Sequence, residues 1–344
     1  MQFTKTVLGS LEKGYAASAF LVRGVQELLF ASEVQAPCVA FNAETGAMRT
    51  VWDGLGGTMS MVPFPGEDGA FLAVHSFFPP FLAEGCGLLR VTPNADGTFT
   101  KTPFLSLPYL HRFALVEEKG SDTLWLLLSV LCREKHGKDD WSSPGYVAVA
   151  RVNKAHTGLA EAPRILLDGQ FHNHGLFKGT QGGKTMICTA SDAGVFAFAP
   201  PQNGCDWQVR QLLAVPTGEA VLADLDGDGA EELVTIAPFH GSALRIYKEQ
   251  NGAWQQVWQA PKAMEFAHSL WAGTLNGEAC GLCGSRRGEA ALFRFYWENG
   301  AWHTQTIDPD AGSSNLCVTK IGGHDCIVSA NHSHNECAVY RAWE

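Results

Sequence analysis

The sequence predicts an all-β chain folded as a seven-bladed β-propeller, and three observations lead to this prediction. First, residues 220–261 contain four short apolar or alternating runs separated by Gly, Asp or Asn turns, which is typical of one four-stranded antiparallel sheet. Second, residues 268–308 repeat the order of this unit, and five weaker copies bring the count to seven at a spacing of about 40 to 55 residues. The weaker copies begin near Ser18, Thr58, His111, His174 and Ser314.

The third observation is that the two ends of the chain complete one another. The last unit, residues 315–344, stops after its third strand, whereas residues 1–10 resemble an outer strand without a blade. Pairing the two would close the ring and leave no exposed sheet edge there. We therefore predict a single propeller domain over residues 1–344, in which residues 1–10 are the outer strand of the last blade.

A four-residue motif sets the register between two of the units. Residues 251–254 and 299–302 both read Asn-Gly-Ala-Trp, a turn followed by the start of an outer strand. Trp254, Trp258 and Trp302 recur at outer-strand positions. We expect these tryptophans to pack between blades rather than to bind sugar.

Charge and composition exclude several classes of partner. A net charge of −10 argues against binding a nucleic-acid backbone. The sequence has no basic segment followed by a long apolar core and no run approaching the length of a membrane span, so no membrane partner is expected. Its 10 cysteines lie scattered, without the dense spacing of a secreted disulfide framework, which favours a cytoplasmic location. The sequence does not indicate an oligomeric state.

Residues 224–232 carry the strongest cation-binding pattern. Asp224, Asp226, Asp228 and Glu232 occupy positions one, three, five and nine of a glycine-containing loop, and such clustered carboxylates suit a hard cation. An EF-hand is excluded because position twelve is Thr235 and the flanking segments are strands. We predict a structural calcium ion that braces the inner strands; the alternative is an acidic turn without an ion.

Histidines recur at equivalent positions of the units. When the units are aligned by their inner turns, the first residue of the innermost strand is His111, His174 or His268 in three of them. In a propeller these positions surround one opening of the central channel. The loop between the second and third strands opens on the same face. This loop carries His240 in unit five, Arg286 and Arg287 in unit six, and His332 and His334 in unit seven.

Imidazole binds borderline metals and transfers protons near neutral pH. On an extended segment a His-x-His pair points to one side, so His332 and His334, or His172 and His174, would share a metal. We predict a divalent transition metal, Mn, Zn, Fe or Ni, with His111 or His172 as general base and Arg286 holding an anionic or carbonyl oxygen. The alternative is that the histidines only line a wet channel. The predicted metal ligands are His174, His268, His332 and His334.

The acidic loop resembles the calcium loop of FG-GAP or VCBS repeats, a resemblance that implies a propeller fold. With its histidines, the chain is similar to the propeller of aldos-2-ulose dehydratases, which act on keto-sugars with a metal. A more remote resemblance is to oligogalacturonate lyases, cytoplasmic propellers with a His-rich manganese site.

These observations predict a metal-dependent lyase, dehydratase or isomerase that removes a proton next to a carbonyl group of a small carbohydrate or sugar acid. Two alternatives remain open. The first is a non-catalytic propeller that binds a protein or sugar, in which case an exposed apolar patch is expected around residues 77–82. The second is a metal-free hydrolase or epimerase that uses histidine alone.

Overall fold

The computed structural model describes residues 1–79, 82–202 and 205–343. Over these residues the strands form seven four-stranded sheets, which confirms the predicted all-β seven-bladed propeller. The described chain divides into two compact units. Unit 1 comprises residues 1–10, 175–197 and 210–344, and unit 2 comprises residues 11–174 and 198–209. A single domain over residues 1–344 stays a prediction, and residue 344 lies outside the described residues.

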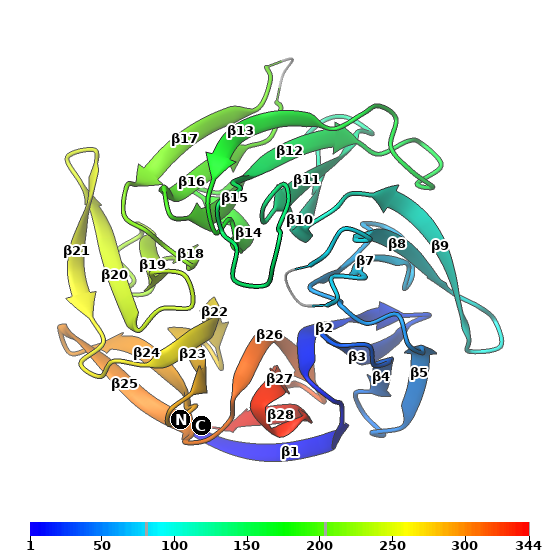
Figure 1. Cartoon of the computed structure of the whole chain (residues 1–344). Helices are drawn as coiled ribbons and strands as arrows, with labels where there is room; N and C mark the ends of the chain where they lie inside the picture. Colours follow the sequence, from blue (N-terminus) through cyan, green and yellow to red (C-terminus); the bar gives the residue numbers. More distant parts are fainter. Residues whose placement is uncertain (80–81, 203–204, 344) are drawn as a thin grey trace. The chain divides into compact units, whose positions relative to one another are not determined.

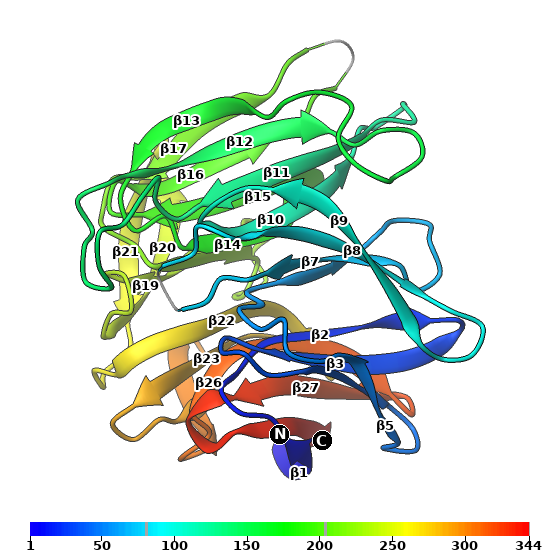
Figure 2. The ribbon, with the colours of Figure 1, turned by 45° about the vertical axis from the view of Figure 1, so that its right-hand side comes forward.

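The first three sheets in chain order belong to unit 2, and Figure 2 shows β10 to β13 running side by side in one of them. The first contains β2 (Gly14–Val22), β3 (Val25–Ser32), β4 (Cys38–Asn42) and β5 (Met48–Trp52). The second contains β6 (Met61–Pro63), β7 (Phe71–His75), β8 (Gly87–Pro93) and β9 (Phe99–Ser106). The third contains β10 (Leu110–Glu117), β11 (Leu124–Val130), β12 (Gly145–Arg151) and β13 (Arg164–Gln170).

The remaining sheets follow in chain order. The fourth contains β14 (Gly175–Gln181), β15 (Lys184–Ser191), β16 (Gly194–Ala199) and β17 (Gln208–Leu213). The fifth contains β18 (Glu219–Ala223), β19 (Glu232–Ala237), β20 (Ala243–Gln250) and β21 (Ala253–Gln259). The sixth contains β22 (Glu265–Leu275), β23 (Glu278–Arg287), β24 (Leu292–Glu298) and β25 (Ala301–Asp308). The seventh contains β26 (Ser313–Ile321), β27 (His324–Asn331), β28 (Glu336–Trp343) and β1 (Gln2–Ser10), with the 3-10 helix η1 (His332–His334) before β28.

The two Asn-Gly-Ala-Trp motifs form hairpins, as their sequence predicts. Asn251 and Gly252 join β20 to β21 with φ values of 53° and 81°. Asn299 and Gly300 join β24 to β25 with φ values of 52° and 81°. Two consecutive left-handed residues fit the twist of a two-residue hairpin, and Asn and Gly tolerate this conformation best.

The predicted packing of outer-strand tryptophans is confirmed in unit 1. Trp258 of β21 and Trp302 of β25 lie with their ring centroids 6.1 Å apart, between the fifth and sixth sheets. Below them, Val234 and Ile236 of β19 share a buried cluster with Phe295 of β24. Each such side chain stabilises the fold by about 1.5 to 3 kcal/mol when fully buried.

The N-terminal strand completes the last sheet, as predicted. β1 pairs antiparallel with β28 from Gln2 opposite Trp343 to Ser10 opposite Glu336, and Figure 1 shows the two strands together with both chain ends. The Lys5 ammonium lies 3.0 Å from Asp308 Oδ2 and 2.7 Å from Glu336 Oε2. Lys5 therefore links β1 to the carboxylates of Asp308 and Glu336 within unit 1.

The surroundings of Asp308 and Glu336 lower the pKa of both carboxylates. Burial alone would raise the pKa of Asp308, but the Asp310 N–H, Lys5 and Tyr340 donate hydrogen bonds that lower it below its ordinary value. Burial would likewise raise the pKa of Glu336, but Lys5 and Asn331 lower it. A carboxylate with a lowered folded-state pKa adds stability above its unfolded-state pKa and loses that contribution as the pH falls through the folded-state pKa.

We predict that Lys5→Met lowers the free energy of unfolding by about 1 kcal/mol at pH 7, because the two carboxylates lose their shared cation. The difference from wild type should shrink below about pH 4, where both carboxylates become protonated. Urea unfolding at pH 7, 5 and 3.5 measures it, with Lys101→Met on the exposed face of β9 as the control. A difference that does not change with pH would contradict this account.

Candidate functional site

The innermost strands of several sheets begin with a β-bulge. In β22, Ala267 and Ser269 pair with Ser285 and Gly284, so the intervening His268 has no partner in the ladder. A bulged residue of this kind is turned away from the regular alternation of the strand, which re-aims its side chain. Residues in the same position of their own sheets are Tyr15 in β2, His111 in β10 and Ser314 in β26.

One cluster of imidazole, aromatic and guanidinium groups lies in unit 1, and we call it the Arg-His cluster. The half-buried His240 ring stacks on Phe266 with centroids 4.0 Å apart and lies 5.2 Å from the ring of His268. The guanidinium carbons of Arg286 and Arg287 lie 5.2 Å and 4.7 Å from the Phe266 centroid, within cation-π range. The cluster comprises His240, Phe266, His268, Arg286, Arg287 and His332.

The protonation of His268 follows from its partner. Nδ1 of this buried ring lies 2.5 Å from the carbonyl oxygen of Ser314. A carbonyl only accepts hydrogen bonds, so Nδ1 carries a proton, and in the neutral form of the ring the lone pair is on Nε2. A ring nitrogen of His268 and one of His240 lie within 4.8 Å of each other. Histidines that bind metals are commonly held by this kind of backbone contact at the second nitrogen.

The predicted extended His-x-His segment at 332–334 is wrong, because these residues form the 3-10 helix η1. Alternation of side chains does not apply in a helix, and the two rings have different partners. Nη2 of Arg286 lies 2.9 Å from Nδ1 and 2.6 Å from Nε2 of the buried His332. His334 Nε2 lies 2.9 Å from Asp310 Oδ1, in a more exposed position. Their role as metal ligands stays a prediction.

A second cluster lies in unit 2, and we call it the Tyr-His cluster. It brings together His111 and His174, whose ring centroids are 4.4 Å apart. The hydroxyl oxygen of Tyr15 lies 3.3 Å from His111 Nε2 and 3.4 Å from His174 Nε2. Phe77 contacts the His111 ring edge-on at 5.4 Å. The cluster comprises Tyr15, Phe77, His111 and His174, all buried.

The expectation that His172 and His174 point to the same side is also wrong. His172 has a φ of 49°, in the left-handed region, so the segment is not extended there. Its ring contacts Trp141 at 4.4 Å, whereas His174 contacts Tyr15. Between them, the Asn173 amide donates to the carbonyl oxygens of Val130 and Tyr146, both at 3.1 Å.

The acidic loop holds a cation from its own chain. Carboxylate oxygens of Asp224, Asp226 and Glu232 lie within 4.8 Å of one another, as a metal site requires. However, Lys248 Nζ lies 2.5 Å from oxygens of Asp226 and Asp228 and 3.1 Å from Glu232. Burial alone would lower the pKa of the Lys248 ammonium, but these three contacts raise it. A calcium ion, which stays a prediction, would have to displace this ammonium.

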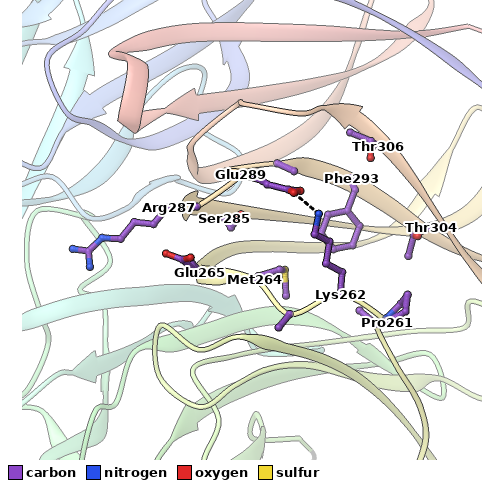
Figure 3. Close-up of a pocket in the computed structure, with 14 residues that line it drawn as sticks. Pro261, Lys262, Met264, Glu265, Ser285, Arg287, Glu289, Phe293, Thr304 and Thr306 are labelled. Carbon is purple, nitrogen blue, oxygen red and sulfur yellow. Dashed lines mark hydrogen bonds and ion pairs between the residues drawn. The ribbon is translucent and has the colours of Figure 1, made fainter.

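One cavity of about 330 Å³ lies within unit 1 beside the Arg-His cluster (Figure 3). Arg287 lines it but extends away from the Lys262–Glu289 ion pair, which joins two of its walls. Met264 and Phe293 form apolar parts of the wall, while Ser285, Thr304 and Thr306 supply hydroxyl groups. The imidazoles of the cluster do not line this cavity.

Sequence reasoning missed several residues of the two clusters. Tyr15 and Phe266 were not predicted, and His240 and Arg287 were noted without a role. Aligning all units at the bulge would have identified Tyr15, because it occupies the position of His111 and His268. Phe266 has no comparable signal, because its φ of 56° is unusual for an aromatic residue.

Comparisons with known proteins support the fold alone. No protein-family model and no curated protein matches the chain. A protein from Bacteroides uniformis, proposed to be a 6-phosphogluconolactonase, is 15% identical with a TM-score of 0.56, over 86% of this chain and 85% of that one. A second such protein, from Bacteroides fragilis, is 10% identical with a TM-score of 0.54 over 85% and 83%. A chain of a mitotic checkpoint complex is 10% identical with a TM-score of 0.60 over 99% and 94%.

These neighbours are propellers by fold and do not establish the predicted relation to FG-GAP repeats, aldos-2-ulose dehydratases or oligogalacturonate lyases, which stays a prediction. Over the described residues, no helix is long and apolar enough to cross a membrane.

The position of Lys248 predicts how the acidic loop responds to calcium. In wild type, excess calcium should raise the free energy of unfolding less than in Lys248→Met, because the ion must first displace the ammonium from its three carboxylate contacts. In Lys248→Met, excess calcium should raise it by about 1 to 3 kcal/mol, because the ion then has a vacated site. Urea unfolding with calcium or EDTA measures this, and Lys320→Met, near the end of β26 in the seventh sheet, is the control. Equal stabilisation of wild type by calcium would overturn the prediction.

Proposed function

We propose that this protein binds a small carbohydrate acid at the Arg-His cluster and acts as a metal-dependent lyase, dehydratase or isomerase. The observation that supports it is the convergence of two guanidinium groups on Phe266, beside the imidazoles of His240 and His268. Guanidinium groups match the planar geometry of a carboxylate and remain charged at all relevant pH values. The cluster is therefore suited to an anionic sugar rather than a neutral one.

The chemistry proposed for this cluster is proton abstraction next to the bound carboxylate or carbonyl group. His240 accepts the proton, since its half-buried ring stacks on the same Phe266 over which both arginines lie. The electron pair of the broken C–H bond moves toward the substrate oxygen, where the charge of Arg286 stabilises it. The bases predicted from sequence, His111 and His172, lie in unit 2 and stay predictions.

The residues present fit a transition metal at His268. Its proton is fixed on Nδ1 by the Ser314 carbonyl, which orients the ring and leaves Nε2 as a ligand atom. When bound, Mn, Zn, Fe or Ni would polarise the substrate oxygen and stabilise negative charge on it. His332 fits less well, because the permanently charged Arg286 already contacts the nitrogen edge of its ring. His332 is better suited to orienting Arg286.

The cavity beside Arg287 agrees with a carbohydrate substrate. Its hydroxyl groups suit the hydroxyls of a sugar, and its volume is at the lower end of small-molecule sites. Two of the structurally similar proteins are proposed to be 6-phosphogluconolactonases, and sugar lactones belong to the same broad class of small carbohydrates.

If the protein were a non-catalytic binding propeller, an exposed apolar patch would be expected around residues 77–82. Phe77 is 1% exposed and packs on His111, while Phe78 and Leu82 are each 37% exposed. Residues 80 and 81 lie outside the described residues. Since Phe77 belongs to a buried cluster, this segment gives the alternative little support.

The proposed anion site predicts charge-dependent binding. Wild type should bind hexuronic or aldonic acids in calorimetric titration and should not bind neutral hexoses. Arg286→Gln and Arg287→Gln should each weaken binding of the acids at least about tenfold, through loss of a charged hydrogen-bond donor. Arg245→Gln, which removes a guanidinium that contacts Gln259 in the fifth sheet, is the matched control. Equal binding of acids and neutral sugars would refute the proposal.

The fixed tautomer of His268 predicts a role in metal retention. His268→Gln should lower affinity for Zn or Mn at least about tenfold, measured by dialysis and atomic emission. His303→Gln, on the outer strand β25, should retain wild-type metal content and serves as the control. Full metal retention by His268→Gln would remove this residue from the proposed ligand set.

A further inference from the structure

The Tyr-His cluster of unit 2 brings three potential ligand atoms to one buried point. The Tyr15 hydroxyl oxygen faces Nε2 of His111 at 3.3 Å and Nε2 of His174 at 3.4 Å. Tyr15 is 3% exposed, and His111 and His174 are each 2% exposed. The three residues come from β2, β10 and the segment that precedes β14, so only the folded chain brings them together.

Both contacts are within hydrogen-bonding range, but at its long end. A hydroxyl that bonds a good acceptor usually approaches to about 2.7 to 3.0 Å. By contrast, ligand atoms bound at about 2.0 to 2.1 Å around a tetrahedral metal stand about 3.4 Å apart, the edge of that tetrahedron. Both oxygen-to-nitrogen distances in the cluster match this edge. We propose that Tyr15, His111 and His174 form a transition-metal site with one phenolate and two imidazole ligands.

The surroundings of the cluster suit such a site. Tyr15 and His111 each occupy a β-bulge, which fixes the direction of their side chains. The chain next to His174 is anchored by the Asn173 amide, which donates to two backbone carbonyls. Phe77 covers one edge of the His111 ring. Three protein ligands leave a fourth position for water or substrate, as in catalytic rather than structural sites.

Metal binding at this site exchanges the phenolic proton of Tyr15 for the metal ion, and the proton is released to solvent. Affinity should therefore rise with pH. The inference goes beyond the proposed function, with which it shares only a transition metal as cofactor. It assigns Tyr15 and His111, instead of His332 and His334, as companions of the predicted ligand His174. Imidazole and phenolate together suit Zn, Mn or Fe better than calcium.

The test is metal titration of the full chain without any sugar. Co²⁺ should bind wild type with the visible absorption of a four-coordinate ion. Cu²⁺ should produce a phenolate-to-metal charge-transfer band, which only tyrosine ligation gives. Tyr15→Phe should remove this band and weaken Co²⁺ binding at least about tenfold, and His111→Gln should weaken binding similarly. Tyr296→Phe, which alters a tyrosine of β24 in unit 1, is the matched control and should behave as wild type.

A folding defect is separated from loss of a ligand by Tyr15→His, which supplies a nitrogen in place of the oxygen. This variant should restore Co²⁺ binding without the charge-transfer band. A band that persists in Tyr15→Phe, or that is absent from wild type, would overturn the proposal. If the metal binds as described and sugar acids do not, the metal site stands and the proposed function fails. If sugar acids bind through Arg286 and the band is absent, the proposed function stands and the metal site fails.

Discussion

The direction of the site residues depends on one backbone constraint, the β-bulge at the start of the innermost strands. A regular antiparallel ladder alternates its side chains between two faces and leaves none pointing along the strand. One additional residue without a ladder partner breaks this alternation. Tyr15, His111, His268 and Ser314 all occupy such a position, and each takes part in a contact with an imidazole. The repeat thus supplies equivalent positions that carry different chemical groups.

The fold was predictable because its signals are local or repeated. The two Asn-Gly turns determine hairpin geometry from the left-handed preference of only two residues. The completion of the last sheet by β1 was predictable because an unpaired outer strand and an incomplete unit need each other. Trp258 of β21 and Trp302 of β25 were placed correctly by their recurrence at outer-strand positions of the repeat. Each inference needed only the spacing of residue types.

The side-chain partners were less predictable, because single backbone angles and distant contacts decide them. One left-handed residue, His172, separates two histidines that alternation would place together. A single turn of 3-10 helix does the same for His332 and His334. The contact of Lys248 with the acidic loop could not be predicted from the sequence of the loop, because Lys248 lies in β20, a different strand of the same sheet. Sequence spacing identified which residues matter but not which atoms they face.

The pairing of β1 with β28 has a consequence for how the protein is made. These strands are nearly a full chain length apart in sequence, so joining them closes the longest loop available to the polypeptide. The entropy of closing such a loop must be overcome before the contacts of Lys5 stabilise it. On the ribosome, β1 must remain unpaired until β28 has been translated. Its run of exposed polar residues is therefore an asset for solubility during biosynthesis.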